Sequence, residues 1–154
     1  MVQRQRGQPA QHRPARSRAG RPNRLTPIPT LRTARVEATI PVQDLDRARA
    51  FYADKLGLTP TTEGQIGIRY ALADGTRFRL FKSSGSSAGA FTQMAFMADD
   101  IDALVRELKS RGVRFEEYNS PSLRTVDGVA DIGYARAAWF KDSEGNLLGI
   151  GQVR

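Results

Sequence analysis

Glu37-Ala38-Thr39-Ile40-Pro41-Val42-Gln43-Asp44-Leu45-Asp46 decides the fold, because the stretch recurs as Gln93-Met94-Ala95-Phe96-Met97-Ala98-Asp99-Asp100-Ile101-Asp102. In each copy a two-residue alternation typical of a strand is followed by an aspartate and then by a helical apolar pattern. A second echo matches Asp74-Gly75-Thr76 to Glu144-Gly145-Asn146. Repetition of this kind predicts two similar modules that share one sheet.

The first copy predicts a βαβββ module at about residues 34–83, and the second predicts another at about residues 91–154. Ser83–Gly89 joins them and has the composition of a flexible linker. Asp44 and Asp100 are placed to cap the two helices. The expected strands are 36–42, 58–63, 66–73, 76–82, 91–98, 113–118, 135–141 and 146–153, and a long loop is expected at 119–134. The sequence therefore predicts an α+β fold, in which both helices cover one face of a curved mixed sheet and the other face forms a cleft.

The positive charge of the chain is concentrated in its first residues. The net charge is +8, but residues 1–35 hold nine arginines and no acid, and the rest of the chain has 15 basic and 16 acidic side chains. Residues 1–33 are rich in Arg, Pro and Gln and poor in large apolar residues, which predicts a disordered tail. The tail has no interleaved aromatic residues, so we expect no specific nucleic-acid partner. A solvated extension, or a start codon placed too far upstream, explains it more simply than a nucleic-acid-binding arm.

Composition excludes several classes of protein and site. The chain has no cysteine, which excludes disulfides and thiolate metal sites. No apolar run approaches membrane-spanning length and the N-terminus has no hydrophobic signal core, so we expect a cytoplasmic protein with no membrane partner. The single histidine, His12, lies in the tail, and there is no glycine-rich phosphate motif. Nucleophilic catalysis therefore has no support in this sequence.

Several short motifs accompany the repeat. They are Val42–Tyr52 with Leu56-Gly57-Leu58 in the first half, and Asp100–Leu104, Gly112-Val113 and Trp139–Asn146 in the second. With these motifs, residues 34–154 resemble the vicinal oxygen chelate superfamily, which includes glyoxalase I, extradiol dioxygenases, fosfomycin-modifying enzymes and bleomycin-resistance proteins. The resemblance implies paired βαβββ modules and a homodimer with clefts near its interface. It does not name a substrate, because the superfamily spans several chemistries.

Metal-dependent members of that superfamily take two ligands from each module, a His or Gln on the first strand and a Glu on the last. The resemblance places the first-strand positions at Glu37 and Gln93, and the last-strand positions at Arg79 and Gly149. A permanently cationic arginine and a residue without a side chain do not ligate a metal. We therefore expect no metal and no other cofactor. The alternative is a divalent metal ion held by Glu37 and Gln93.

Strand alternation extends the set of residues expected to face the cleft. Glu37 and Arg79 are expected to pair; with Gln93 they either bind a polar group of a small molecule or only satisfy each other. Arg124 and Asp127, in the long loop, are placed either to close over a ligand or to remain solvated. The predicted ligand-binding residues are Glu37, Thr39, Arg79, Phe81, Gln93, Met97, Trp139 and Gly149; Ala95, Leu147 and Gly151 share their parity, and Tyr118 and Phe140 are aromatic candidates for either the pocket or the core.

The motifs of the fold are present, but two of the four metal-ligand positions have no ligating side chain. This combination favours a metal-independent small-molecule-binding protein of the glyoxalase/bleomycin-resistance type, which sequesters a drug or a metabolite. The alternative is a metal-dependent lyase, isomerase or dioxygenase of the same superfamily. The residues best suited to such an enzyme are Glu37, Gln93 and Glu144, and Glu37 is the best candidate for a catalytic residue. A regulatory module that has lost ligand binding is a third interpretation, so the sequence leaves enzymatic activity open.

Overall fold

The computed structural model describes residues 31–154. The chain divides into two units, Met1–Arg35 and Val36–Arg154. In the first unit, Leu31–Thr33 form a short 3-10 helix, η1. Almost all of the expected tail lies outside the described residues, so its disorder stays a prediction. Within residues 31–154, no helix has both the length and the apolar content needed to cross a membrane.

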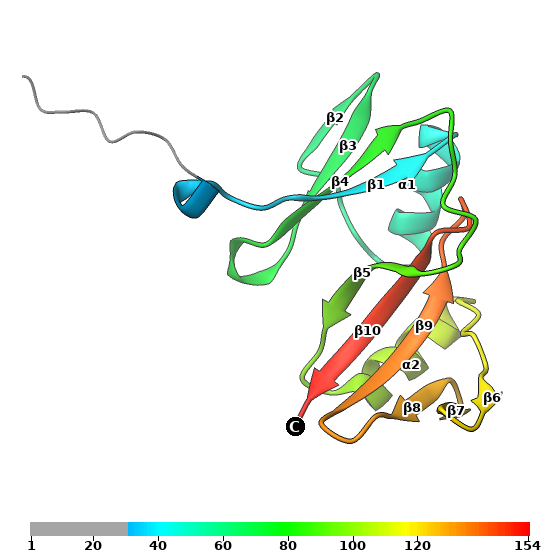
Figure 1. Cartoon of the computed structure of the whole chain (residues 1–154). Helices are drawn as coiled ribbons and strands as arrows, with labels where there is room; N and C mark the ends of the chain where they lie inside the picture. The colour runs from blue at the N-terminus through cyan, green and yellow to red at the C-terminus, as the bar shows by residue number, and fades with distance from the viewer. Residues whose placement is uncertain (1–30) are drawn as a thin grey trace, which may run out of the picture. The chain divides into compact units, whose positions relative to one another are not determined.

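The first βαβββ module is formed as the repeat predicts (Figure 1). Its sheet has the order β1-β4-β3-β2, with β1 parallel to β4 and the other pairs antiparallel. The Asp74-Gly75 turn joins β3 to β4 through a one-turn 3-10 element, η2 (Ala73–Gly75), in which Asp74 has φ 54°. The elements are β1 (Ala38–Val42), α1 (Leu45–Asp54), β2 (Thr62–Gly64), β3 (Gly67–Ala71) and β4 (Arg77–Lys82).

The second module repeats this plan and adds strands to it. Its sheet has the order β5-β10-β9-β8-β7-β6, and β5 runs parallel to β10 as β1 does to β4. The elements are β5 (Thr92–Met97), α2 (Ile101–Ser110), β6 (Asn119–Ser120), β7 (Leu123–Val126), β8 (Val129–Asp131), β9 (Ala135–Lys141) and β10 (Leu147–Val153). The α+β class and the paired modules are therefore confirmed. The expectation of one shared sheet is wrong, because among the described residues no strand of one module pairs with a strand of the other, and each module has a sheet of its own.

Two expectations for the second module are wrong. Residues 113–118 do not form a strand; only Phe115 makes a bridge, to Phe140. The expected loop at 119–134 instead contains β6, β7 and β8, and β8 pairs with β9 from Val129 to Asp131. Because β8 occupies that length of the β9 edge, it leaves residues 113–118 little edge to pair with. Asp127-Gly128, with φ of 54° and 82°, forms the two-residue turn between β7 and β8.

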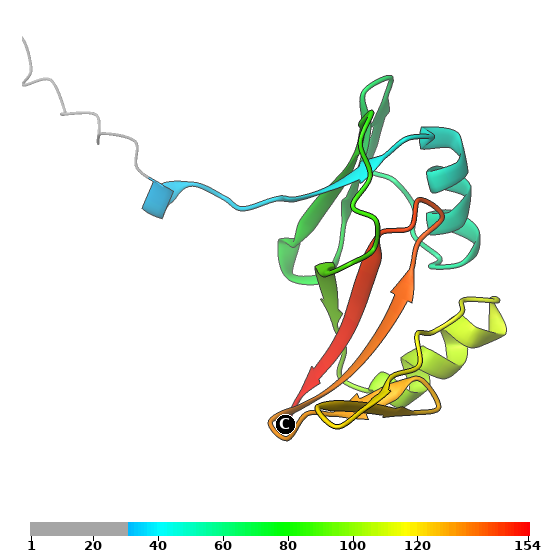
Figure 2. The same cartoon turned by 45° about the vertical axis from the view of Figure 1, so that its right-hand side comes forward.

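Both helices begin at the predicted caps and lie on the same side of the strands (Figure 2). The Asp44 side chain accepts a hydrogen bond from the Arg47 N–H at 2.9 Å, and the Asp100 side chain accepts one from the Ala103 N–H at 2.9 Å. One apolar core lies between the helices and the sheets and extends through both modules. Its most deeply buried members are Ile40, Val42, Tyr52, Tyr70, Phe78, Leu80, Ile101, Phe140, Leu148 and Ile150. The opposite side of the strands, here called the open face, carries the alternate residues.

Candidate functional site

The open face of the first module carries a cluster of one carboxylate and two guanidinium groups. Arg79 on β4 lies opposite Thr39 of β1 on one side and opposite Arg69 of β3 on the other. The Nε of Arg69 lies 3.1 Å from Oε2 of Glu37, and the Nε of Arg79 lies 3.8 Å from Oε1 of the same carboxylate. The expected contact between Glu37 and Arg79 is therefore present, and Arg69 joins it. We call Glu37, Arg69 and Arg79 the charged cluster.

Sequence reasoning missed Arg69, although a signal for it existed. The repeat that relates Arg79 to Gly149 also relates Arg69 to Trp139, which the sequence did single out. The pairing confirms this correspondence, because Arg69 lies opposite Arg79 just as Trp139 lies opposite Gly149. Corresponding positions of the two modules thus hold cationic side chains in the first, and a glycine and an aromatic ring in the second.

Gln93 does not join the charged cluster. Its Nε2 donates to Oδ1 of Asn146 at 3.1 Å, and the Asn146 side chain is fully buried. The Nδ2 of Asn146 donates to the carbonyl oxygen of Pro41 at 2.9 Å and to Asp142 at 2.9 Å. Gln93 is therefore engaged in a polar network that links the β9–β10 turn to β1. The sequence quoted Asn146 only as part of a motif and assigned it no role.

The open face of the second module is built around Gly149. A Cβ at this position would lie 3.3 Å from the Thr92 methyl group, 3.4 Å from the Ala95 Cβ and 3.7 Å from the Trp139 ring. The Trp139 ring packs edge-on against Tyr118, with ring centroids 5.5 Å apart. Phe140, one residue along β9, is instead fully buried in the core. Trp139 and Tyr118 are therefore the aromatic pair of the open face.

Pockets between the first strands of the two modules contain several of the predicted residues. Thr39 and Gln93 line a pocket of about 560 Å³ together with Ser87 and Phe91. A second pocket, of about 320 Å³, is lined by Ala38 of β1, by the β3–β4 turn and the start of β4, and by residues of β5 that include Ala95 and Met97. Met97 keeps 66% of its surface exposed. Side chains of the two modules therefore lie close together along β1 and β5.

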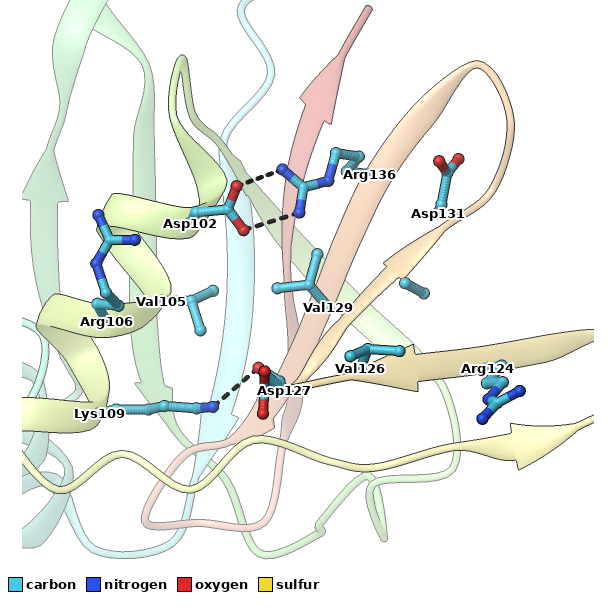
Figure 3. Close-up of a pocket in the computed structure, with 11 residues that line it drawn as sticks. Asp102, Val105, Arg106, Lys109, Arg124, Val126, Asp127, Val129, Asp131 and Arg136 are labelled. Atoms are coloured by element: carbon cyan, nitrogen blue, oxygen red, sulfur yellow. Dashed lines mark hydrogen bonds and ion pairs between the residues drawn. The ribbon is translucent and has the colours of Figure 1, made fainter.

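A third pocket lies on the helix side and contains the two loop residues that were expected near the cleft (Figure 3). It measures about 760 Å³ and is lined by α2 and the β7–β8 hairpin, with Val105 and Val129 between them. Arg124 and Asp127 line this pocket, so they lie on the side of the sheet that α2 covers. Arg136 and Asp102 close one end of it through two hydrogen bonds of 2.5 and 2.8 Å.

Comparison with known proteins identifies the family. Residues 34–150 match the model of the Glyoxalase/Bleomycin resistance protein/Dioxygenase superfamily. The chain belongs to that superfamily. Among proteins with curated descriptions, none matches this sequence. The family assignment confirms the resemblance that the motifs indicated, and it leaves the particular activity open because members of one fold carry different chemistries.

Several solved structures share this fold at low sequence identity. A glyoxalase/bleomycin resistance protein from Catenulispora acidiphila DSM 44928 is 22% identical, with 77% of this chain and 97% of that chain covered and a TM-score of 0.56. TnmS3, an antibiotic binding protein from Streptomyces sp. CB03234, is 23% identical, with 79% and 98% covered and a TM-score of 0.56. The fosfomycin resistance protein FosX from Listeria monocytogenes is 16% identical, with 79% and 94% covered and a TM-score of 0.59.

The residues at the superfamily's four metal-ligand positions do not fit a metal ion in this structure. Glu37 is engaged by two guanidinium groups, Arg79 is itself one of them, Gln93 donates to Asn146, and Gly149 has no side chain. Among residues 31–154, no group of three or more His, Cys, Asp or Glu side chains is arranged to hold a metal. A cation would therefore meet one already paired carboxylate and the positive charge of Arg79.

Glu144, the other carboxylate that the sequence analysis assigned to the alternative enzyme, has a structural role. Its side chain is 2% exposed and lies at the start of α1. It accepts hydrogen bonds from the backbone N–H groups of Gln43 and Asp44 at 2.9 and 3.2 Å. It also accepts two from the Arg47 guanidinium, at 2.7 and 3.0 Å. These contacts join the β9–β10 turn to the first module, so this carboxylate is not available to a ligand.

The Glu144 contacts predict an acid-sensitive contribution to stability. Burial raises the pKa of the Glu144 carboxyl, but hydrogen bonds from Arg47, Gln43 and Asp44 outweigh it and hold the pKa below the ordinary value of 4.5. A carboxyl with a lowered folded-state pKa stabilises the fold above its unfolded-state value, and this contribution is lost as the pH falls through the folded-state value. We expect Glu144→Gln to be less stable than wild type near neutral pH, and the difference to shrink below about pH 4.5.

Urea unfolding of both proteins across this pH range measures the difference directly. Glu107→Gln is the matched control, because Glu107 pairs with Arg111 one helical turn away and its side chain is 56% exposed. The control is expected to change the free energy of unfolding by less than about 0.5 kcal/mol at every pH. A Glu144→Gln difference that stays constant down to about pH 3 would contradict the prediction.

Proposed function

We propose that this protein binds a small organic molecule on its open face, without a metal ion, and sequesters the molecule without transforming it. The charged cluster carries this proposal, because it fills the first module's metal-ligand positions with an ion-paired glutamate and an arginine. The ligand class we propose is a drug-like natural product or metabolite, by analogy with the antibiotic binding protein TnmS3.

The distribution of side chains on the open face supports a binding role. Gly149 is packed closely against Thr92, Ala95 and the Trp139 ring, and Met97 is largely exposed. Phe81 follows Arg79 on the same face of β4 and is partly exposed. Apolar and aromatic surface beside a few polar anchors is the usual composition of a small-molecule site.

Trp139 provides a direct assay, because it is the only tryptophan of the chain. We expect a natural-product library, screened by Trp139 emission, to yield compounds that change the emission saturably, with the same affinity in the presence of EDTA. Mass spectrometry after denaturation is expected to return each compound unchanged. Gly149→Leu, whose side chain would crowd Thr92, Ala95 and the Trp139 ring, is expected to weaken binding by about tenfold or more.

Gly64→Leu is the matched control, because Gly64 lies on β2 and a Cβ there would approach nothing closer than 4.0 Å. This variant is expected to bind as wild type does. Binding that EDTA abolishes, or conversion of the compound to a product, would contradict the proposal and favour a metal-dependent lyase, isomerase or dioxygenase. Equal binding by Gly149→Leu and wild type would move the ligand away from the second module.

A further inference from the structure

We infer that the charged cluster is an anion-binding subsite, so that the molecule bound on the open face carries a carboxylate, phosphate, sulfonate or similar group that docks on Arg69 and Arg79. This inference rests on the proposed function and adds the charge of the ligand to it. The arrangement of the three side chains leads to it in three steps.

The first step is the balance of charge within the cluster. Arg69 and Arg79 lie directly opposite each other on adjacent antiparallel strands. Like charges in this position repel each other and destabilise the sheet, and a counter-charge offsets the repulsion. Glu37 supplies one negative charge for two positive ones. The cluster therefore keeps a surplus positive charge that one further anion would balance.

The second step is the set of hydrogen-bond donors that remain. Glu37 approaches both guanidinium groups from the Nε side, and within residues 31–154 the Nη atoms of Arg69 and Arg79 donate to no protein acceptor. A guanidinium presents its donors as a planar fork that suits the paired oxygens of a carboxylate or a phosphate. Two such forks on neighbouring strands therefore offer a ready site for an oxyanion.

The third step is a buried donor without a partner. The Nε of Arg79 is shielded from solvent, and among the described residues no acceptor lies within hydrogen-bonding distance, since Glu37 Oε1 is 3.8 Å away. Buried donors are nearly always satisfied, so one left over beside a surplus charge indicates an acceptor that comes from outside the chain. The Arg79 stem is held in place across β3, where Gly67 lets it lie close to the strand.

Inorganic phosphate is the probe, because it tests the subsite without requiring the rest of the ligand. We expect the Nε–Hε resonances of Arg69 and Arg79 to shift together and saturably as phosphate is added to the full chain. Arg79→Gln is expected to weaken phosphate binding about tenfold or more, because it removes one fork and the surplus charge. Glu37→Gln is expected to tighten it about threefold or more, because the competing negative charge is gone.

The response to Glu37→Gln decides between an anion site and a cation site. If Glu37 instead held a cation or a metal, Glu37→Gln would weaken the binding of that cation and would leave the affinity for phosphate unchanged. Arg124→Gln is the matched control, since Arg124 lies in the helix-side pocket and forms no ion pair within the described part of the chain. In the wild-type chain the Nε–Hε resonance of Arg124 is expected to shift weakly and without saturation, and Arg124→Gln is expected to bind phosphate as wild type does.

Two outcomes would overturn the inference: linear shifts at Arg69 and Arg79 that match those of Arg124, or phosphate binding by Glu37→Gln that is unchanged or weaker. The library screen separates this inference from the proposed function. Compounds that bind beside Trp139 while phosphate fails would remove the anion subsite alone. Saturable phosphate binding without any library hit would remove sequestration and leave the subsite in place.

Discussion

Phe78→Ala is expected to lower the free energy of unfolding by about 4 kcal/mol, the usual cost of removing a fully buried phenyl ring. Phe78 is 1% exposed and stacks on Tyr70 with ring centroids 4.9 Å apart and planes 11° apart. It also meets Phe96 of the second module edge-on at 6.1 Å. The ring therefore belongs to the part of the core where the two modules touch, and its loss leaves a cavity there.

Equilibrium urea unfolding followed by far-ultraviolet circular dichroism gives the change directly. Phe91→Ala is the matched control, because Phe91 is 63% exposed. The control is expected to change the free energy of unfolding by less than about 0.5 kcal/mol. A loss below about 1 kcal/mol for Phe78→Ala would show that the surrounding rings close over the space, and would contradict the expected cavity between the modules.

Asn146→Leu is expected to lower the free energy of unfolding by about 3 kcal/mol, since it keeps the volume of the side chain and removes its polar atoms. The Pro41 carbonyl would lose a donor, and Gln93 and Ser87 would lose their shared acceptor. Asp142 would also lose the Nδ2 hydrogen bond. Buried polar groups without partners are more costly than the net value of the bonds they once made.

Ser87→Ala is the matched control for this network. It removes only the Ser87 hydrogen bond to Asn146, of 3.1 Å, at the partly exposed edge of the network. We expect it to change the free energy of unfolding by less than about 1 kcal/mol. If the free energy of unfolding of Asn146→Leu lies within about 0.5 kcal/mol of the wild-type value, water replaces the lost partners and the network does not hold the modules together.

Much of the fold was readable from the sequence, because its signals are local. The two capping aspartates, the Asp74-Gly75 turn and the alternation of β1 and β5 all act over a few residues, and each is formed as expected. The error at residues 113–118 has a different origin. Apolar residues there suit a strand, but strand formation needs an edge to pair with, and β8 pairs with β9 at Arg136–Ala138, so that only a bridge at Phe115 forms. The Asp127-Gly128 turn was a readable hairpin signal that the sequence analysis passed over.

The candidate site was predictable in position and not in detail. Parity along the strands placed Arg79 and Gly149 on the open face, and the repeat gave their correspondence. Whether Gln93 turns toward Glu37 or toward Asn146 depends on partners more than fifty residues away, which no local pattern encodes. Ligand binding by the predicted residues, the homodimer and the cytoplasmic location stay predictions.

The contacts of the β9–β10 turn also bear on the order in which the molecule assembles. Glu144 and Gln43 are 101 residues apart in sequence, and Asn146 and Pro41 are 105 apart. Strand pairing within each module spans shorter stretches of chain, 40 residues from Ala38 to Phe78 and 55 from Thr92 to Leu147, whereas this turn closes a loop of about a hundred residues. We expect the turn to dock late in folding, so that its variants unfold faster while their refolding rate hardly changes. Kinetic lifetime, rather than speed of folding, is then what this short turn controls.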